Sequence, residues 1–557
     1  MAYRENIRCT KLKLVWHDAW RSNLSLCCRQ VFFAKVQHHG KIYHQLKQMN
    51  CLFLCASSSS EAYQDLAHKY MAIEPPTWAL LLAESCRSKG YTVSIIDALA
   101  ENLSDADVVQ RVKNTSPDLV LFVVYGQNPN AGTTGMIGAT RTCKLLRESL
   151  PKQLISFVGS HVSALPKEVL ETTHADFVLT NEGVYALHEV LGALKTSKEW
   201  KDVRGIAYMD SNNKSVLNEG MPIVPQEKMD IDLPGYAWDL LPFKEKPLDL
   251  YRAHYWHANF RDDLRTPFAS IYTSLGCVFG CEFCMINILN RENMSDGIHA
   301  GDSRVMRYWS TEWVIRQLRK LSELGAYTVR IADEMFFFRE DKYRPLLETI
   351  ISEGLCFNFW AYARVDTVRD KDLKLFKKAG VNWLCLGIEA GNRMVRKEIS
   401  KGSFKDVKVD SIVQSIQSAG IYVLGNYIFG FPHDTFKTMQ ETLDMAIDLC
   451  TEHANFYACT ALPGSSLYYE SISKGWYVPS SPNYSEYAFL GKDHVPLPTN
   501  TLSASEVLRF RDDAWNKYFT SSRYIDFVRE RLGTEAVKNI QQMASIKLCR
   551  KLLENVD

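Results

Sequence analysis

Short apolar segments alternate with helical segments over most of this 557-residue chain. In residues 50–200, Cys51–Ala56 and Leu119–Tyr125 have the length of buried strands, and Thr77–Lys89 has the apolar period of a helix. Strands separated by helices of this length predict an α/β fold with a doubly wound parallel sheet. In such a sheet, ligands bind beyond the carboxyl ends of the strands, where loops such as Gly126–Gly135 and Gly159–Ser163 follow.

Residues 266–465 repeat the alternation and predict a partial (βα)6 barrel, with too few strands for the complete eight-stranded form. The predicted strands are Phe268–Ser274, Tyr327–Ala332, Phe357–Ala363, Trp383–Ile388, Tyr422–Ile428 and Ala454–Cys459. The helices between them are expected to begin near Thr311, Arg339, Asp370, Phe404 and Thr435. Residues 201–265 are proline-rich and read as a linker, and residues 466–557 read as a C-terminal cap with helices from Ser503 onward.

The charge and composition of the chain exclude several classes of protein. The net charge of +1 favours neither a nucleic-acid nor a membrane partner, and no apolar run reaches the length of about 18 residues that a transmembrane helix needs. Fifteen cysteines scattered along the chain are not a disulfide framework, so we expect a cytoplasmic protein. Residues 1–49 form a basic N-terminal extension, either a loosely ordered leader or a tail that binds phosphate.

Three cysteines follow the first predicted barrel strand in the spacing C-x3-C-x2-C: Cys277, Cys281 and Cys284. Three thiolates on one short loop can hold three irons of a 4Fe–4S cluster. The fourth iron then stays open for a ligand from outside the protein. The alternatives are a zinc knuckle that uses His299 as a fourth ligand, or unrelated core cysteines.

With the aromatic Phe283 before the last cysteine, this motif resembles that of radical S-adenosylmethionine (SAM) enzymes. In that family, SAM binds the open iron, and one electron from the cluster cleaves it into methionine and a 5′-deoxyadenosyl radical. The resemblance implies that the three cysteines are catalytic metal ligands. It also implies an external one-electron reductant of the flavodoxin or ferredoxin type and a small-molecule substrate.

The ends of the barrel strands resemble the family's SAM-binding elements. Asp333 or Glu334 would contact the SAM amino group, with a helix N-cap as the alternative for Asp333, and Arg364 would contact the carboxylate unless it pairs with Asp366 or Glu389. Gly387–Gly391 resembles a G-I-E-S/T-G element, although Ala390 replaces the hydroxyl residue. The predicted SAM-binding residues are Phe283, Asp333, Glu334, Tyr362, Arg364, Glu389, Asn426 and Ile428.

Residues 50–200 resemble the cobalamin-binding domain, Rossmann- or flavodoxin-like, that precedes the barrel in one large subfamily. The resemblance implies cobalamin as a third cofactor, although the D-x-H-x-x-G signature of His-ligated cobalamin proteins is absent. A flavodoxin-like domain kept for packing or for another ligand is the alternative, and His161 is either a structural loop histidine or an axial cobalt ligand. The predicted cobalamin-binding residues are Gln127, Asn128, Thr133, Thr134, Gly159, Ser160, His161, Glu182 and Gly183.

The pairing of the two domains predicts a cobalamin-dependent radical SAM methyltransferase. Its substrate would be an unactivated carbon, or phosphorus, of a small molecule or biosynthetic intermediate. A cobalamin-dependent radical rearrangement or cyclisation without methyl transfer is the second hypothesis. The third is a non-catalytic sensor or electron carrier that binds cluster and corrin.

Overall fold

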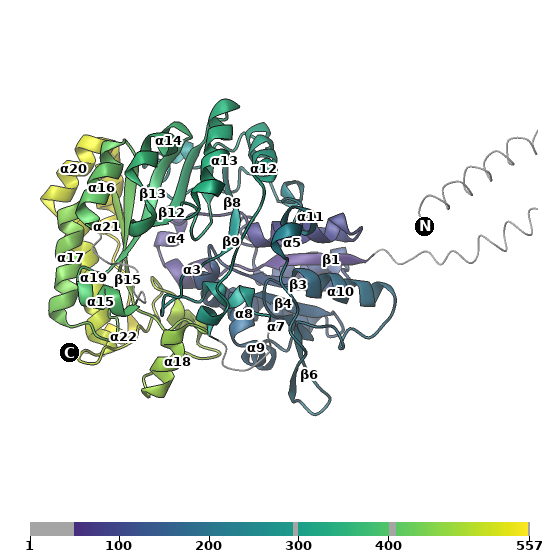
Figure 1. Cartoon of the computed structure of the whole chain (residues 1–557). Helices are drawn as coiled ribbons and strands as arrows, with labels where there is room; N and C mark the ends of the chain where they lie inside the picture. The colour runs from purple at the N-terminus through teal and green to yellow at the C-terminus, as the bar shows by residue number, and fades with distance from the viewer. Residues whose placement is uncertain (1–48, 293–298, 400–407, 555–557) are drawn as a thin grey trace, which may run out of the picture. The chain divides into compact units, whose positions relative to one another are not determined.

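The computed structural model describes residues 49–292, 299–399 and 408–554 (Figure 1). Residues 1–48 of the predicted basic extension, and the helix start expected near Phe404, lie outside the described residues. Within the described ranges, no helix combines the length and the apolar character needed to cross a membrane.

The first sheet has seven strands in the order β2-β1-β3-β4-β5-β6-β7. Strands β1 to β5 are parallel, as predicted, and helices connect them. The strands are β1 Asn50–Cys55, β2 Thr92–Asp97, β3 Leu119–Val124, β4 Ile155–Gly159 and β5 Phe177–Leu179. The helices are α3 Ser59–Tyr63, α4 Leu66–Lys69, α5 Thr77–Ser88, α6 Asp105–Thr115, α7 Gly132–Ser149, α8 Ser160–Ala164, α9 Pro166–Thr173 and α10 Val184–Lys195. All six residues of β3 are buried, as expected for a central parallel strand that is covered on both faces.

The predicted linker contributes two strands to this sheet. β6 (Ile206–Met209) pairs antiparallel with β5, and β7 (Ser215–Leu217) pairs antiparallel with β6. With four and three residues, these strands are too short to show the alternation from which a strand is predicted. The rest of the segment, which includes α11 (Met229–Asp232), has little regular structure.

The loop after β3 is shorter than predicted, because α7 already begins at Gly132. A short 3-10 turn, Pro129–Ala131, leads directly into the helix. A Cβ atom on Gly132 would lie 2.1 Å from the Ser160 hydroxyl oxygen, so glycine allows the helix start to pack against α8.

The second sheet has six parallel strands in the order β15-β14-β13-β12-β11-β8. The strands are β8 Phe268–Ile271, β11 Thr328–Ile331, β12 Asn358–Arg364, β13 Val381–Glu389, β14 Tyr422–Phe429 and β15 His453–Ala458. Neighbours in space are neighbours in sequence, which is the arrangement of a partial (βα)6 barrel, and the connecting helices cover its outer face (Figure 1). These helices are α12 Thr311–Glu323, α13 Glu340–Ser352, α14 Leu373–Lys378, α15 Arg393–Ile399, α16 Val409–Ser418 and α17 Phe436–Leu449.

The first predicted barrel strand is split in two. β8 ends at Ile271, and β9 (Ser274–Gly276) turns away to pair antiparallel with β10 (Met306–Tyr308). The C-terminal cap is helical, as predicted, and Ser503 caps its first long helix with a capping box to Glu506. The helices after the barrel are α18 Ser466–Ser473, α19 Ala504–Thr520, α20 Ser522–Leu532, α21 Thr534–Ala544 and α22 Lys551–Glu554.

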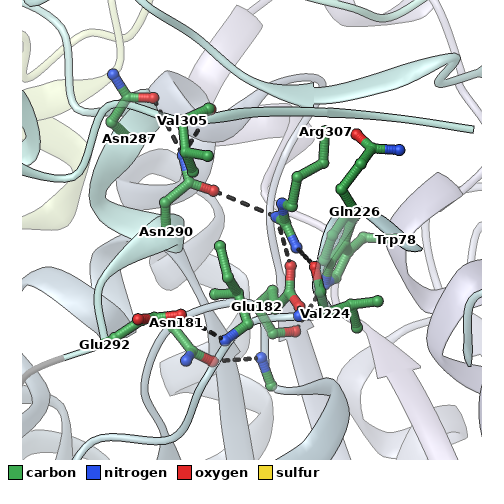
Figure 2. Close-up of polar contacts among 12 residues, drawn as sticks. Trp78, Asn181, Glu182, Val224, Gln226, Asn287, Asn290, Glu292, Val305 and Arg307 are labelled. Atoms are coloured by element: carbon green, nitrogen blue, oxygen red, sulfur yellow. Dashed lines mark hydrogen bonds and ion pairs between the residues drawn. The ribbon is translucent and has the colours of Figure 1, made fainter. Parts of the chain in front are cut away.

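A buried ion pair joins the loop after β5 to strand β10 (Figure 2). Arg307 Nη2 donates to Glu182 Oε2 at 2.8 Å, and the two side chains are only 4% and 2% exposed. Val224 completes a ring, because its N–H donates to Glu182 Oε1 at 2.5 Å and its carbonyl accepts from Arg307 Nη1 at 2.6 Å. The segment that carries Val224 is therefore fastened to the loop after β5 and to the β9–β10 pair.

Replacing Glu182 by alanine should lower the free energy of unfolding by about 3–5 kcal/mol, because Arg307 would stay buried without its counter-charge. Chemical denaturation followed by circular dichroism measures the change. The matched control is Glu219→Ala, since the Glu219 side chain is 84% exposed and lies 3.7 Å from Arg204. Equal effects of the two substitutions would show that the ion pair does not hold the segment.

Candidate functional site

The cysteine loop lines a cavity of about 980 Å³. Cys277, Cys281 and Cys284 all face it from the segment directly after β9. Among the described residues, no three His, Cys, Asp or Glu side chains are grouped closely enough to hold a single metal ion. A 4Fe–4S cluster does not need such a grouping, since each thiolate binds a different iron of the cluster.

Hydrogen-bond donors surround the three sulfur atoms. The Phe279 N–H donates to Cys277 Sγ at 3.4 Å, Asn130 Nδ2 lies 3.6 Å from Cys284 Sγ, and Arg364 Nη1 lies 3.8 Å from Cys281 Sγ. Burial raises the pKa of the Cys277 thiol to about 12, and it also raises the pKa values of Cys281 and Cys284. Without iron the three groups are therefore thiols, and iron would displace their protons. The soft sulfur donors and the surrounding N–H groups fit an iron–sulfur cluster.

Asn287 fixes the shape of the cysteine loop. Its side-chain oxygen accepts from the Cys277 N–H at 3.0 Å, and its side-chain nitrogen donates to the Phe279 carbonyl at 3.1 Å. Asn290 Nδ2 donates to the same Asn287 oxygen at 3.2 Å, and Arg307 donates to Asn290 Oδ1 at 3.3 Å (Figure 2). A chain of buried polar groups therefore runs from Glu182 to the first cysteine.

Either Asp333 or Glu334 was predicted to contact the SAM amino group, and the two side chains have different surroundings. Asp333 accepts hydrogen bonds from the Thr273 N–H and hydroxyl, both at 2.6 Å, and from the Ser274 hydroxyl at 2.5 Å. These bonds hold the junction of β8 and β9, so Asp333 supports the cysteine loop from behind. Glu334 lines the cavity, and its Oε1 is buried with no hydrogen-bond partner within the described ranges.

Arg364 lines the cavity and also pairs with a neighbouring carboxylate, while its contact with the SAM carboxylate stays a prediction. Its Nε and Nη2 donate to the two oxygens of Asp366 at 3.0 and 3.1 Å, which is the ion pair expected as the alternative. The guanidinium also lies 3.9 Å from the centre of the Phe279 ring, and Nη1 faces Cys281. The Asp366 pair and the stacked ring thus fix a positive charge beside the cysteine loop.

The remaining predicted SAM residues line the same cavity: Phe283, Tyr362, Glu389, Asn426 and Ile428. Glu389 has a φ of +66°, which is uncommon for a residue with a side chain and occurs next to an irregularity in the β13–β14 register. Burial raises the pKa values of both Glu389 and Glu334 to about 7. The cavity therefore contains two carboxyl groups that a cationic ligand would ionise.

The predicted cobalamin residues divide into two groups. Gln127, Asn128 and Thr134 line the cavity, and Asn128 Oδ1 is a buried acceptor that no described group satisfies. The remaining residues do not line it: Thr133, Gly159, Ser160, His161, Glu182 and Gly183. Their role in binding cobalamin stays a prediction. The open acceptor and the glycine-rich loop fit a large ligand that carries amide donors.

Several residues outside the cavity already have protein partners. His161 bonds to Thr133 at 3.1 Å and to Glu168 at 3.2 Å, and its ring packs edge-on against Tyr484. These contacts are those of a structural histidine. Glu182 is engaged with Arg307 and Val224.

Two side chains that were not predicted from the sequence connect the domains at the site. Asn130, from the loop after β3, accepts from the Met285 N–H at 3.0 Å besides contacting Cys284. Arg330, from β11, is 1% exposed and donates to Glu74 at 2.7 Å and to the Gln127 carbonyl at 2.8 Å. The polar loop Gly126–Gly135 was the only signal for Asn130, and a buried arginine has no sequence signal of its own.

Protein-family models match both of the domains that line the cavity. The model of the B12 binding domain matches residues 63–191, and that of the Radical SAM superfamily matches residues 271–446. The chain belongs to the radical SAM enzymes that carry a B12-binding domain. All the predicted site residues of this radical SAM enzyme lie inside the two matched ranges.

Individual relatives cover most of the enzyme. An uncharacterized methyltransferase of Pyrococcus horikoshii is 29% identical over 401 residues, which are 72% of this chain and 79% of that protein. The anaerobic magnesium-protoporphyrin IX monomethyl ester cyclase of Rubrivivax gelatinosus is 27% identical over 403 residues, 71% of this chain and 66% of that protein. The radical SAM methyltransferase TsrM from Kitasatospora setae, solved with cobalamin and a 4Fe–4S cluster, has a TM-score of 0.61 at 14% identity. That match covers 89% of this chain and 99% of the other, and it shows the shared fold.

Replacing Asn287 by alanine should weaken the retention of a reconstituted cluster by about tenfold to a hundredfold, because the Cys277 N–H and the Phe279 carbonyl lose their partner. The measurement is the anaerobic rate at which a chelator bleaches the cluster absorbance. Asn114→Ala is the control, since Asn114 is an exposed residue of α6. Equal bleaching rates in the two variants would exclude a role for Asn287 in holding the loop.

Proposed function

We propose that this enzyme methylates an unactivated carbon or phosphorus of a small molecule, using a 4Fe–4S cluster, SAM and cobalamin. The observation that carries the proposal is the single cavity into which both domains project. Asn130 of the B12-binding domain lies 3.6 Å from the sulfur of Cys284, on the barrel's cysteine loop. The site that binds the methyl carrier and the site that forms the radical would therefore lie next to the same substrate.

Different residues of this chain would bind and orient the cluster and SAM. Cys277, Cys281 and Cys284 would hold the cluster, and Glu334 would receive the SAM amino group at its open buried oxygen. When bound, the cluster and SAM supply one-electron radical chemistry, and cobalamin supplies a transferable methyl group. Phe283 and Ile428 bring apolar surface to the same space, which keeps water from a reactive centre.

A second candidate is a radical cyclisation or rearrangement without methyl transfer. The similarity to the Rubrivivax gelatinosus cyclase favours it, since that relative matches over nearly the same share of this chain as the methyltransferase does. The mass of the product separates the two candidates, because methylation adds one CH2. Both candidate reactions would use an external one-electron reductant of the flavodoxin or ferredoxin type.

Replacing Cys281 by alanine should abolish both the cluster absorbance and the reductive cleavage of SAM, because one iron loses its thiolate. Anaerobic reconstitution, followed by iron analysis and by detection of 5′-deoxyadenosine, measures both. The control is Cys356→Ala, since Cys356 is an exposed free cysteine and does not line the cavity. Undiminished SAM cleavage in the Cys281 variant would contradict the proposed function.

The affinity for SAM should rise with pH and level off above about 7. Burial raises the pKa of Glu334 to about 7, so below that pH the carboxyl is protonated and must lose its proton to bind an ammonium group. The affinity should therefore fall by up to about tenfold per pH unit below 7. Anaerobic equilibrium dialysis between pH 6 and 8 measures it, and Glu334→Gln should flatten the profile. A profile that keeps its slope in this variant would assign the titration to another group, such as Glu389.

A further inference from the structure

The cavity extends well beyond the residues that would hold the cofactors. It continues from the barrel interior, past Asn455 and Tyr457 of edge strand β15, to the C-terminal cap and to helices α3 and α4. The edge strands of the barrel sheet are β8 and β15. α19 lies against β15, where Arg511 Nε donates to the Phe456 carbonyl at 2.8 Å. We call this extension the lateral lobe and define it by six side chains: Tyr63, Leu66, Trp515, Met543, Ile546 and Leu548.

The six side chains that define the lateral lobe are all apolar or aromatic, and the polar residues Asn516, Asn539, Ser545 and Lys547 line the cavity beside them. Each of the six defining residues is only partly buried, although each one lines the cavity. Their remaining exposed surface thus belongs at least in part to the cavity. Apolar surface of this kind gains most from contact with an apolar ligand, because that contact removes it from water.

The charged groups that border the lobe are engaged with one another. Asp512 accepts from Arg550 Nε and Nη2, both at 3.0 Å, and from Arg511 Nη1 at 2.7 Å. Arg511 also holds the Phe456 carbonyl, so these groups brace the cap against the barrel. Lys547 is the remaining charged residue of this part of the lining, and it is exposed.

Polar contacts connect the two domains beside the lobe. Gln64, at the end of α3, donates to the Leu490 carbonyl at 2.6 Å and accepts from the Cys549 N–H at 3.1 Å. Lys69, at the end of α4, donates to Asn539 at 3.2 Å and to Gln542 at 2.8 Å. These hydrogen bonds join α3 and α4 to the C-terminal cap beside the lobe.

We propose that the lateral lobe binds the body of a large, predominantly hydrocarbon substrate, such as a fused-ring or isoprenoid molecule. The reacting carbon then lies in the barrel interior, beside Tyr362 and Asn426, within the space that the cofactor residues also line. This inference rests on the proposed function and adds the substrate class. It predicts that a small phosphorylated metabolite is not the principal substrate, because Lys547 is the one cation of this part of the lining outside the Arg511–Asp512–Arg550 cluster.

The test measures binding of an uncharged apolar probe, N-phenyl-1-naphthylamine, to the anaerobic protein loaded with cluster, SAM and cobalamin. Equilibrium dialysis should show saturable binding, and Leu66→Arg and Ile546→Arg should each weaken it at least tenfold. Ile231→Arg is the matched control, since Ile231 is 58% exposed and outside the cavity, and it should bind as the wild type does. If an arginine variant fails to fold, Met543→Gln replaces it.

The possible results separate the two proposals. An absence of saturable binding, or equal binding by the lobe variants and the wild type, would overturn the substrate class. Displacement of the probe by ribose 5-phosphate would overturn it as well. Cleavage of SAM by the wild type and by Ile231→Arg is measured separately with a chemical reductant. Its failure would contradict the proposed function, while the binding of the probe would still report on the lobe.

Discussion

The conformation of one short loop, from Gly276 to Met285, is the constraint on which the site depends. Amide side chains hold it from two directions, Asn287 from the barrel side and Asn130 from the B12-binding domain. Asp333 fixes the strand junction just before the loop. Three cysteines on a loop without such supports would sample many arrangements, and metal binding would have to overcome the lost conformational entropy.

The buried Glu182–Arg307 pair stabilises the surroundings of this loop. It joins the loop after β5 to the β9–β10 pair, next to the cysteine loop. Both side chains are withdrawn from water, so removing either one leaves the other as an uncompensated buried charge. From Arg307 the polar chain continues through Asn290 to Asn287, and each member has a partner. Both terminal nitrogens of Arg307 are hydrogen-bonded in this network, although its Nε is a buried donor without a partner among the described residues. A buried polar network of this type favours a single arrangement of the segments that it joins.

Local patterns were enough to predict most of the fold and the centre of the site. The strands β1, β3 and β14 could be predicted because each contains a run of mostly buried apolar residues. The cysteine spacing pointed to a loop that lines the cavity in the structure. The short strands β6 and β7 were missed because three or four residues show no period. Asn130 and Arg330 were missed for another reason: their partners lie 154 and more than 200 residues away, and only tertiary packing brings them together.

The partial barrel differs from a closed one in having two strand edges. An edge strand presents unpaired N–H and carbonyl groups that can pair with another chain. Here Arg511 of α19 occupies the carbonyl of Phe456 on β15, and Tyr518 holds the carbonyl of Thr451 just before that strand. The cap therefore covers part of the β15 edge, where these carbonyls would otherwise be open to a neighbouring molecule. A chain truncated before Ser503 would leave β15 open to self-association, whatever its cofactors.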